Sequence, residues 1–200
     1  MMNATPEQQK AALRQRVRNA LGNLSPADRS AGSIQACTRL QQEPVWREAT
    51  WVLLYSPLPD ELDVLPLLRD ALSAGKRVAL PRFDPVRNIY LACHVMNLDA
   101  DLRAGHYGIR EPRDNCPVVR SNRLDFVLVP GVAFAMDGRR LGRGKGVYDR
   151  LLMSVRGSKC GAGFDEQIVD DLPVEPHDVR LDCILTPTRW RCAEPRAVLK

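Results

Sequence analysis

The chain has 200 residues, of which 44% are hydrophobic and 26% are charged, and its formal net charge is +5. This length supports one domain with a sizeable core, and the composition is typical of globular proteins rather than disordered or fibrous ones. No apolar run approaches the roughly 18 residues of a membrane helix, and the N-terminus lacks the apolar core of a secretory signal. The modest positive charge suits anionic small molecules. The charge also permits weak nucleic-acid binding, but the lack of a long Lys/Arg block and of an aromatic RNA-binding motif argues against nucleic acid as a partner.

The cysteines form no CxxC pair and show no zinc-binding spacing. We interpret them as reduced thiols of a cytoplasmic protein, some of them buried as small apolar side chains. The six positions are Cys37, Cys93, Cys116, Cys160, Cys183 and Cys192.

Two capped helices are predicted first, over residues 6–21 and from residue 25 to about residue 42. Thr5 is the expected N-cap of the first. Lys10 and Arg14 are four residues apart and therefore share a face of that helix. Taken alone, this pair indicates only a solvated basic edge.

Residues 49–55 form a continuous apolar run that predicts a buried strand, and residues 64–75 and 76–81 predict a helix and a second strand. This order is typical of a βαβ unit. The loop after the first strand carries Glu61 and Asp63, and ligands of open α/β sheets collect at the carboxyl ends of strands. Asp63 is also a plausible N-cap of the helix, so capping and ligand binding both remain open for this loop.

A third strand is predicted over residues 89–96, and a turn-rich loop over residues 102–112. In that loop Tyr107 offers a ring that could stack on a flat ligand, although a structural turn explains it equally well. Later strands are predicted over residues 159–164 and 179–185. Alternating elements of this kind predict one α/β domain, with a largely parallel sheet covered on both faces. Residues 1–5 and 190–200 are expected to be peripheral tails.

The chain is organised around a strand over residues 125–129, a turn at Asp137-Gly138, and a loop in which glycines alternate with Arg143 and Lys145. Glycines leave backbone N–H groups open to a ligand, and a nest of such groups beside cations suits phosphate. The loop is neither a Walker A motif, because Gly146 follows Lys145, nor the GxGxxG of dinucleotide-binding folds. On composition alone, a mobile basic surface loop is the alternative.

The segment PGVAF followed by RLGRGKGxYD resembles the signature of the 5-formyltetrahydrofolate cyclo-ligase family. Other elements of that family occur in the same order: KxxLR over residues 10–14, the acidic loop over residues 61–63, YGIxEP over residues 107–112, and HDxxxD over residues 177–182. The chain departs from the family at Val147, where an aromatic residue is common. If that ring helps to hold folate, affinity for particular folates is expected to differ.

The resemblance implies a three-layer α/β/α sandwich. It also implies an enzyme that uses ATP and Mg²⁺ to convert 5-formyltetrahydrofolate to 5,10-methenyltetrahydrofolate, with release of ADP and phosphate. We expect a cytoplasmic monomer. The alternatives are a non-catalytic nucleotide- or folate-binding module, a kinase-like enzyme for another N-formyl compound, and a basic RNA-associated protein.

The implied site falls into three groups. ATP binding is assigned to the first helix and the glycine loop, at Lys10, Arg14, Arg140, Leu141, Gly142, Arg143, Gly144, Lys145, Gly146, Val147 and Tyr148. Within this set the predicted catalytic residues are Lys145, Arg143 and Tyr148. Substrate contacts are assigned to Leu58, Glu61, Asp63 and Tyr107, and Mg²⁺ to Asp149 and Asp178.

Overall fold

The computed structural model describes residues 5–105, 108–173, 175 and 178–192. Within these residues the α-helices are α1 (Pro6–Gly22), α2 (Pro26–Gln42), α3 (Pro44–Arg47), α4 (Leu65–Ser73) and α5 (Val147–Leu152). Short 3-10 helices are η2 (Ser121–Arg123) and η3 (Asp165–Gln167). The strands are β1 (Trp51–Leu53), β2 (Arg77–Asp84), β3 (Ile89–Val95), β4 (Leu102–Ala104), β5 (Arg110–Pro112), β6 (Phe126–Pro130), β7 (Ala133–Phe134), β8 (Arg140–Leu141), β9 (Ser158–Ala162), β10 (Cys183–Leu185) and β11 (Trp190–Cys192).

The first two helices begin where their capping residues predict. The Thr5 hydroxyl accepts a hydrogen bond from Gln8 N, and the Gln8 side chain accepts one from Thr5 N, so the two residues form a capping box. Ser25 caps α2 through Asp28 N. These bonds satisfy N–H groups that the first turn of a helix cannot pair internally.

A seven-stranded sheet forms the centre of the described structure, in the order β11-β10-β9-β6-β1-β2-β3. Neighbouring strands from β10 to β2 run parallel, and the two edge strands, β3 and β11, are antiparallel to their neighbours. The predicted βαβ unit is confirmed, because β1 and β2 pair in parallel and α4 connects them. Their carboxyl ends therefore meet at one edge of the sheet.

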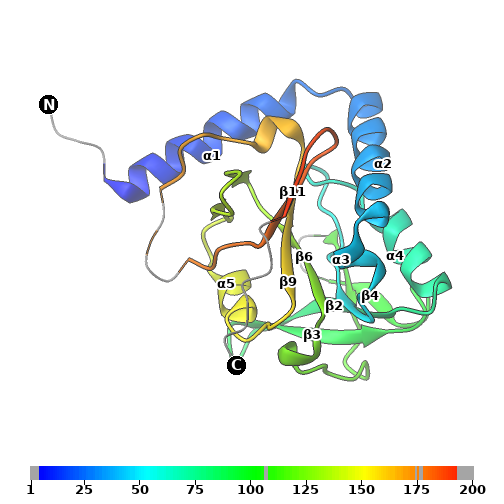
Figure 1. Cartoon of the computed structure of the whole chain (residues 1–200). Helices are drawn as coiled ribbons and strands as arrows, with labels where there is room; N and C mark the ends of the chain where they lie inside the picture. Colours follow the sequence, from blue (N-terminus) through cyan, green and yellow to red (C-terminus); the bar gives the residue numbers. More distant parts are fainter. Residues whose placement is uncertain (1–4, 106–107, 174, 176–177, 193–200) are drawn as a thin grey trace, which may run out of the picture.

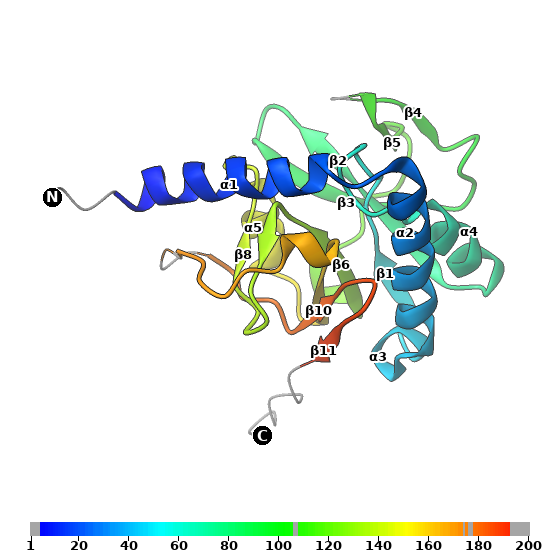
Figure 2. The same cartoon turned by 90° about the horizontal axis from the view of Figure 1, so that it is seen from above.

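Apolar side chains cover both faces of the sheet, which confirms the α/β/α sandwich. Along β6, Phe126 and Leu128 face a core shared with α1 to α4, whereas Val127 and Val129 face one shared with α5. This alternation follows from the two-residue period of a strand. Figures 1 and 2 show α2, α3 and α4 gathered on one side of the sheet.

Two parts of the chain differ from the sequence-based predictions. Residues 102–112 were expected to be a turn-rich loop, but β4 and β5 pair within them as a small antiparallel sheet. The strand expected over residues 179–185 is confined to β10. The chain then turns back, so that β11 extends the central sheet where a peripheral tail was expected.

The prediction of six reduced thiols is wrong for one pair. Cys183 and Cys192 lie opposite each other in the β10–β11 register and form a disulfide. The remaining cysteines, Cys37, Cys93, Cys116 and Cys160, are buried free thiols. The spacing of the sequence could not reveal the pair, because no strand had been predicted at residue 192.

In the described part of the chain, no helix combines the length and the apolar character needed to cross a lipid bilayer.

Candidate functional site

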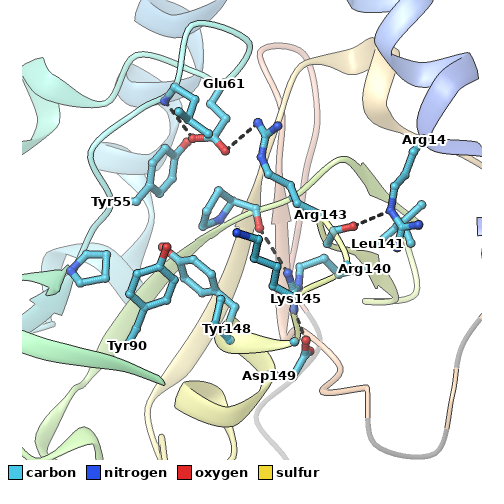
Figure 3. A pocket seen from close by; sticks show the side chains of 18 of the residues that line it. Arg14, Tyr55, Glu61, Tyr90, Arg140, Leu141, Arg143, Lys145, Tyr148 and Asp149 are labelled. Atoms are coloured by element: carbon cyan, nitrogen blue, oxygen red, sulfur yellow. Dashed lines mark hydrogen bonds and ion pairs between the residues drawn. The ribbon is translucent and has the colours of Figure 1, made fainter. Parts of the chain in front are cut away.

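A cavity of about 880 Å³ lies at the carboxyl-end edge of the sheet. Tyr55 and Ser56, which follow β1, line it together with Pro81 of β2 and with Pro130 and Gly131 at the end of β6. Parallel strands place their carboxyl ends together, so loops that are distant in sequence converge on this space. Figure 3 draws 18 of the lining residues and labels ten of them.

The glycine segment forms one wall of the cavity. It begins as the β7–β8 hairpin, whose turn contains Gly138 at a φ of 91°, as the Asp137-Gly138 pair predicts. Gly144 and Gly146 also have positive φ, 98° and 62°, which side chains rarely tolerate. Gly146 is the N-cap residue of α5. The glycines therefore let the chain turn tightly along the wall and leave its backbone exposed to a ligand.

Cations surround this loop. Arg14 Nε donates to Gly142 O at 3.0 Å, which ties α1 to the loop. Arg140 has a side chain that is 4% exposed, and its Nη2 lies 2.7 Å from Asp149 Oδ1. Its Nε is buried and has no hydrogen-bond partner. Lys145 lines the cavity, and in Figure 3 its side chain reaches into the space between the arginines and the tyrosines.

Lys10 lies in an acidic setting beside the glycine loop. Its Nζ is 2.6 Å from Glu175 Oε2 and 3.3 Å from Asp178 Oδ2. Burial opposes its charge, but the hydrogen bond to Glu175 and the charge of Asp178 raise the pKa of Lys10 above its ordinary value. Lys10 therefore stays charged at any physiological pH.

The opposite wall is aromatic. The rings of Tyr90 and Tyr148 lie 5.3 Å apart between centroids, and Arg140 Cζ is 6.0 Å from the centroid of the Tyr148 ring. Tyr55 is fully buried, and its hydroxyl donates to Leu62 O. Burial raises the pKa of both Tyr55 and Tyr148 well above 10. Their hydroxyls therefore remain protonated at neutral pH, and the wall offers flat apolar faces to a ring.

An acidic loop closes the upper side of the cavity in Figure 3. Glu61 has a side chain that is 8% exposed. Its Oε2 accepts from Leu58 N at 3.0 Å, and its Oε1 lies 3.2 Å from Arg143 Nη2. Burial raises the pKa of Glu61 above 4.5, and Arg143 opposes that shift. Arg143 also pairs with Asp60 at 2.7 Å, so it joins the glycine loop to the acidic loop.

The structure brings most of the predicted site residues to this cavity. All eleven assigned to ATP line it, as do Leu58, Glu61, Asp149 and Asp178. Asp63 is an exception, because it lies outside the lining and its Oδ1 instead accepts from Leu65 N at the start of α4. The prediction of Asp63 as the N-cap is nevertheless wrong, because the N-cap residue of α4 is Val64, which makes no side-chain capping bond. Tyr107 lies outside the described residues.

Eleven lining residues had no predicted site role, among them Tyr55, Asp60, Tyr90 and Arg110. Tyr55 carries a recognisable signal, because it ends the run of residues 49–55 at the ligand-binding edge. Tyr90 gave no signal of its own, since it belongs to an ordinary alternating strand.

No cluster of three or more His, Cys, Asp or Glu side chains that could hold a metal occurs in the described residues. Asp149 and Asp178 both line the cavity, and each contacts a cation. Mg²⁺ is usually held by one or two carboxylates together with substrate phosphates and waters. The donor set therefore fits an ion that arrives with a nucleotide better than one enclosed by the protein.

An open α/β sheet with a glycine loop, converging cations and an aromatic wall at its carboxyl edge defines an enzyme for anionic ligands. The comparisons with known proteins identify the kind of enzyme. The chain belongs to the 5-formyltetrahydrofolate cyclo-ligase family, whose model matches residues 6–187.

Curated relatives agree with this assignment. The chain is 35% identical over 170 residues to a 5-formyltetrahydrofolate cyclo-ligase of Escherichia coli (strain K12), a match that covers 83% of this chain and 93% of the relative. It is 26% identical over 196 residues to a mouse protein of the same name, which covers 92% and 97% of the two chains.

Solved structures agree as well. The 5,10-methenyltetrahydrofolate synthetase of Aquifex aeolicus matches with a TM-score of 0.84 and 34% identity, over 96% of each chain. A synthetase from Mycoplasma pneumoniae matches with a TM-score of 0.72 and 24% identity, over 89% of this chain and 98% of that one, and supports the fold.

Proposed function

We propose that the chain catalyses the ATP- and Mg²⁺-dependent cyclisation of 5-formyltetrahydrofolate to 5,10-methenyltetrahydrofolate, with release of ADP and phosphate. One observation carries this proposal: a single cavity joins a cation-lined glycine loop to a wall of tyrosines. Phosphate and a flat pterin ring need these two surfaces side by side.

The chemistry explains why both ligands must meet. An N-formyl group is a poor electrophile, and its oxygen is a poor leaving group. Transfer of the γ-phosphoryl group to the formyl oxygen releases ADP and activates the carbon. N10 then attacks that carbon and loses its proton. The bond from carbon to oxygen breaks as phosphate leaves, and the ring of the methenyl product closes.

Phosphoryl transfer depends on positioning and on neutralising charge. Lys145 and Arg143 are the proposed catalytic cations, because both come from the glycine loop and line the cavity. Lys10, Arg14 and Arg140 hold the remaining phosphate charge.

Both the ring and the hydroxyl of Tyr148 contribute to its proposed role. Its ring packs near Tyr90 and Arg140, and its hydroxyl remains protonated. We assign it to orienting the substrate ring beside the phosphate. Leu58 and Glu61, in the acidic loop across the cavity, are the proposed substrate contacts. Because Glu61 is buried, its carboxyl group is held in place to form a hydrogen bond with the substrate.

Asp149 and Asp178 are the residues that would hold Mg²⁺, together with phosphate oxygens. Bound there, the ion would neutralise phosphate charge. Asp63 and Tyr107 complete the assigned substrate set. For Asp63 the proposed role would be indirect, through the position of the loop that carries Glu61.

The proposed reaction can be tested by measuring absorbance in the near ultraviolet, where the conjugated product absorbs and the substrate does not. Purified protein is mixed with 5-formyltetrahydrofolate, and ATP and Mg²⁺ are added separately and together. A rise that needs both additions supports the proposal. A flat trace from protein that binds ATP would contradict it and favour a non-catalytic module or another N-formyl substrate.

We also propose that the protein is a cytoplasmic monomer. Light scattering of the purified protein and fractionation of cells test these two points.

A further inference from the structure

Six cations line the cavity, and one of them is set apart from the others. Lys10, Arg14, Arg140, Arg143 and Lys145 come from α1 and from the glycine segment, where phosphate is expected. The sixth, Arg110, comes from β5. We propose that Arg110 binds the carboxylates of the glutamate portion of the folate. This inference rests on the proposed function and names a specificity-determining residue for the same site.

The position of Arg110 separates it from the phosphate side. In Figure 2, β5 lies near β2, whereas β8 lies farther along the molecule. Ser56 and Ile109, which also line the cavity, lie beside Arg110 in space and in sequence respectively. Ser56 Oγ donates to Arg110 O at 2.6 Å, which fixes the backbone of β5 to the loop after β1.

The side chain of Arg110 is available to a ligand. It is 49% exposed, and its Nη2 donates to Leu98 O at 2.6 Å. Its ion pair with Asp99 is 3.7 Å long, and the Asp99 side chain is 98% exposed. Such a solvated pair is worth little and is readily exchanged. A guanidinium carries five donors, so Arg110 can keep the bond to Leu98 O and still receive a carboxylate.

The shape of the substrate explains why a second cation belongs at this place. The reacting N5 and N10 must lie beside the phosphate, at Lys145 and Arg143. The glutamate group is at the opposite end of the folate from the pterin. In the bound substrate it must therefore extend along the tyrosine wall to a different part of the cavity. Tyr90 belongs to this wall, and its strand β3 contacts β5, the strand of Arg110. A cavity with one anion site at each end selects folates that carry glutamate.

The test compares two ligands and two variants. The ligands are 5-formyltetrahydrofolate and a pteroate analogue, the methylamide of 5-formyltetrahydropteroate, which has an uncharged amide in place of the glutamate group. The variants are Arg110→Ala and, as a matched control, Arg103→Ala. Arg103 lies on the partner strand β4, pairs with Asp114 at 2.7 Å, and is not among the residues that line the cavity. Both variants remove one exposed arginine from the same small sheet.

Loss of a charge-assisted hydrogen bond predicts that Arg110→Ala weakens binding of 5-formyltetrahydrofolate about tenfold. The same variant should leave binding of the pteroate analogue unchanged, and Arg103→Ala should bind both ligands like the wild type. Dissociation constants come from quenching of tyrosine and tryptophan fluorescence, which needs no turnover. Where turnover occurs, KM for the folate should rise more than kcat falls.

The outcomes separate the two proposals. Equal weakening for both ligands, or no weakening for either, overturns the role of Arg110, whatever the turnover of the wild type. Ligand-selective weakening without turnover would support Arg110 and contradict the proposed reaction. A wild-type protein that binds neither ligand overturns both.

Discussion

Arg143 Nη2 lies 2.7 Å from Asp60 Oδ1, and this contact joins the glycine loop to the loop after β1. Both side chains are partly exposed, at 45% and 38%, so the pair contributes little to stability. The contact matters because it holds the guanidinium of Arg143 near the cavity, where a phosphate can replace the carboxylate of Asp60 as its partner.

Replacement of Arg143 tests that role. Arg143→Ala should lower kcat by roughly 100-fold, because one charge-stabilising contact in a transition state is typically worth about that much. The exposed pair with Asp60 stabilises the fold by less than about 1 kcal/mol, and loss of the contact with the buried Glu61 adds to that cost, so the melting temperature should fall by no more than about 5 °C. Steady-state kinetics and thermal unfolding measure the two effects.

Asp60→Ala is the matched control, because it removes the same contact but keeps the cation. Its kcat should fall far less than that of Arg143→Ala. Equal losses in the two variants would mean that the contact itself, rather than the charge of Arg143, supports turnover.

The two carboxylates assigned to Mg²⁺ should respond differently to substitution. Asp149→Asn leaves the buried Arg140 without its counter-charge, which typically costs about 3 kcal/mol or more. Asp178→Asn leaves the Arg140 pair intact. We therefore expect Asp178→Asn to raise the Mg²⁺ concentration for half-maximal activity about tenfold, as loss of a supporting ligand commonly does, and to change stability less than Asp149→Asn does.

Titration of activity with Mg²⁺ and unfolding in urea measure these two effects. An Asp178→Asn protein with wild-type Mg²⁺ dependence would remove Asp178 from the proposed metal set.

The buried carboxyl group of Glu61 should make the free energy of unfolding depend on pH. Burial raises the pKa of Glu61 above its ordinary value of 4.5 in the folded protein. Below that value the carboxyl is neutral in both states and has no electrostatic cost. As the pH rises from 4.5 through the folded pKa, the unfolded state loses its proton first, and the stability of the folded state falls.

Glu61→Gln removes this titration while keeping a side chain that can accept hydrogen bonds. Its free energy of unfolding relative to the wild type should therefore rise between pH 4 and pH 7. The exposed Glu166 supplies the control through Glu166→Gln. Denaturant unfolding across that range makes the comparison, and parallel curves for wild type and Glu61→Gln would contradict the burial argument.

The disulfide can be tested by counting thiols. Alkylation of the unfolded, unreduced protein should modify four cysteines, and reduction beforehand should raise the number to six. The bond closes a short loop with a sequence separation of 9 residues, so Cys192→Ser should lower stability by about 2–3 kcal/mol on the chain-entropy estimate. Six reactive thiols without reduction would instead restore the interpretation of reduced cysteines.

Much of the fold was predictable because local signals were strong. Thr5 and Ser25 begin helices through their own side chains, and the run ending at Tyr55 is too apolar for any place except a buried strand. The glycine loop was equally clear, since positive φ at Gly144 and Gly146 is a requirement of the local backbone. Signals of this kind depend on neighbours in the sequence.

Features that depend on distant partners could not be predicted. β11 becomes a strand only because β10 offers it an edge, and the Cys183–Cys192 bond follows from that pairing. Asp63 was predicted to touch substrate, but its carboxylate turns toward Leu65 N, while Asp60 reaches the cavity and Arg143. Within a short acidic loop, the backbone path decides which carboxylate faces the ligand, and the sequence does not specify that path.

The central claim is that the formyl oxygen is phosphorylated and leaves as part of phosphate. The most direct measurement uses 5-formyltetrahydrofolate labelled with ¹⁸O in the formyl group, with mass analysis of the released phosphate after turnover with ATP. Phosphorylation of the formyl oxygen predicts one labelled oxygen in each phosphate released. Label in the water, with unlabelled phosphate, would contradict it, because ATP would then have been hydrolysed without activating the formyl group.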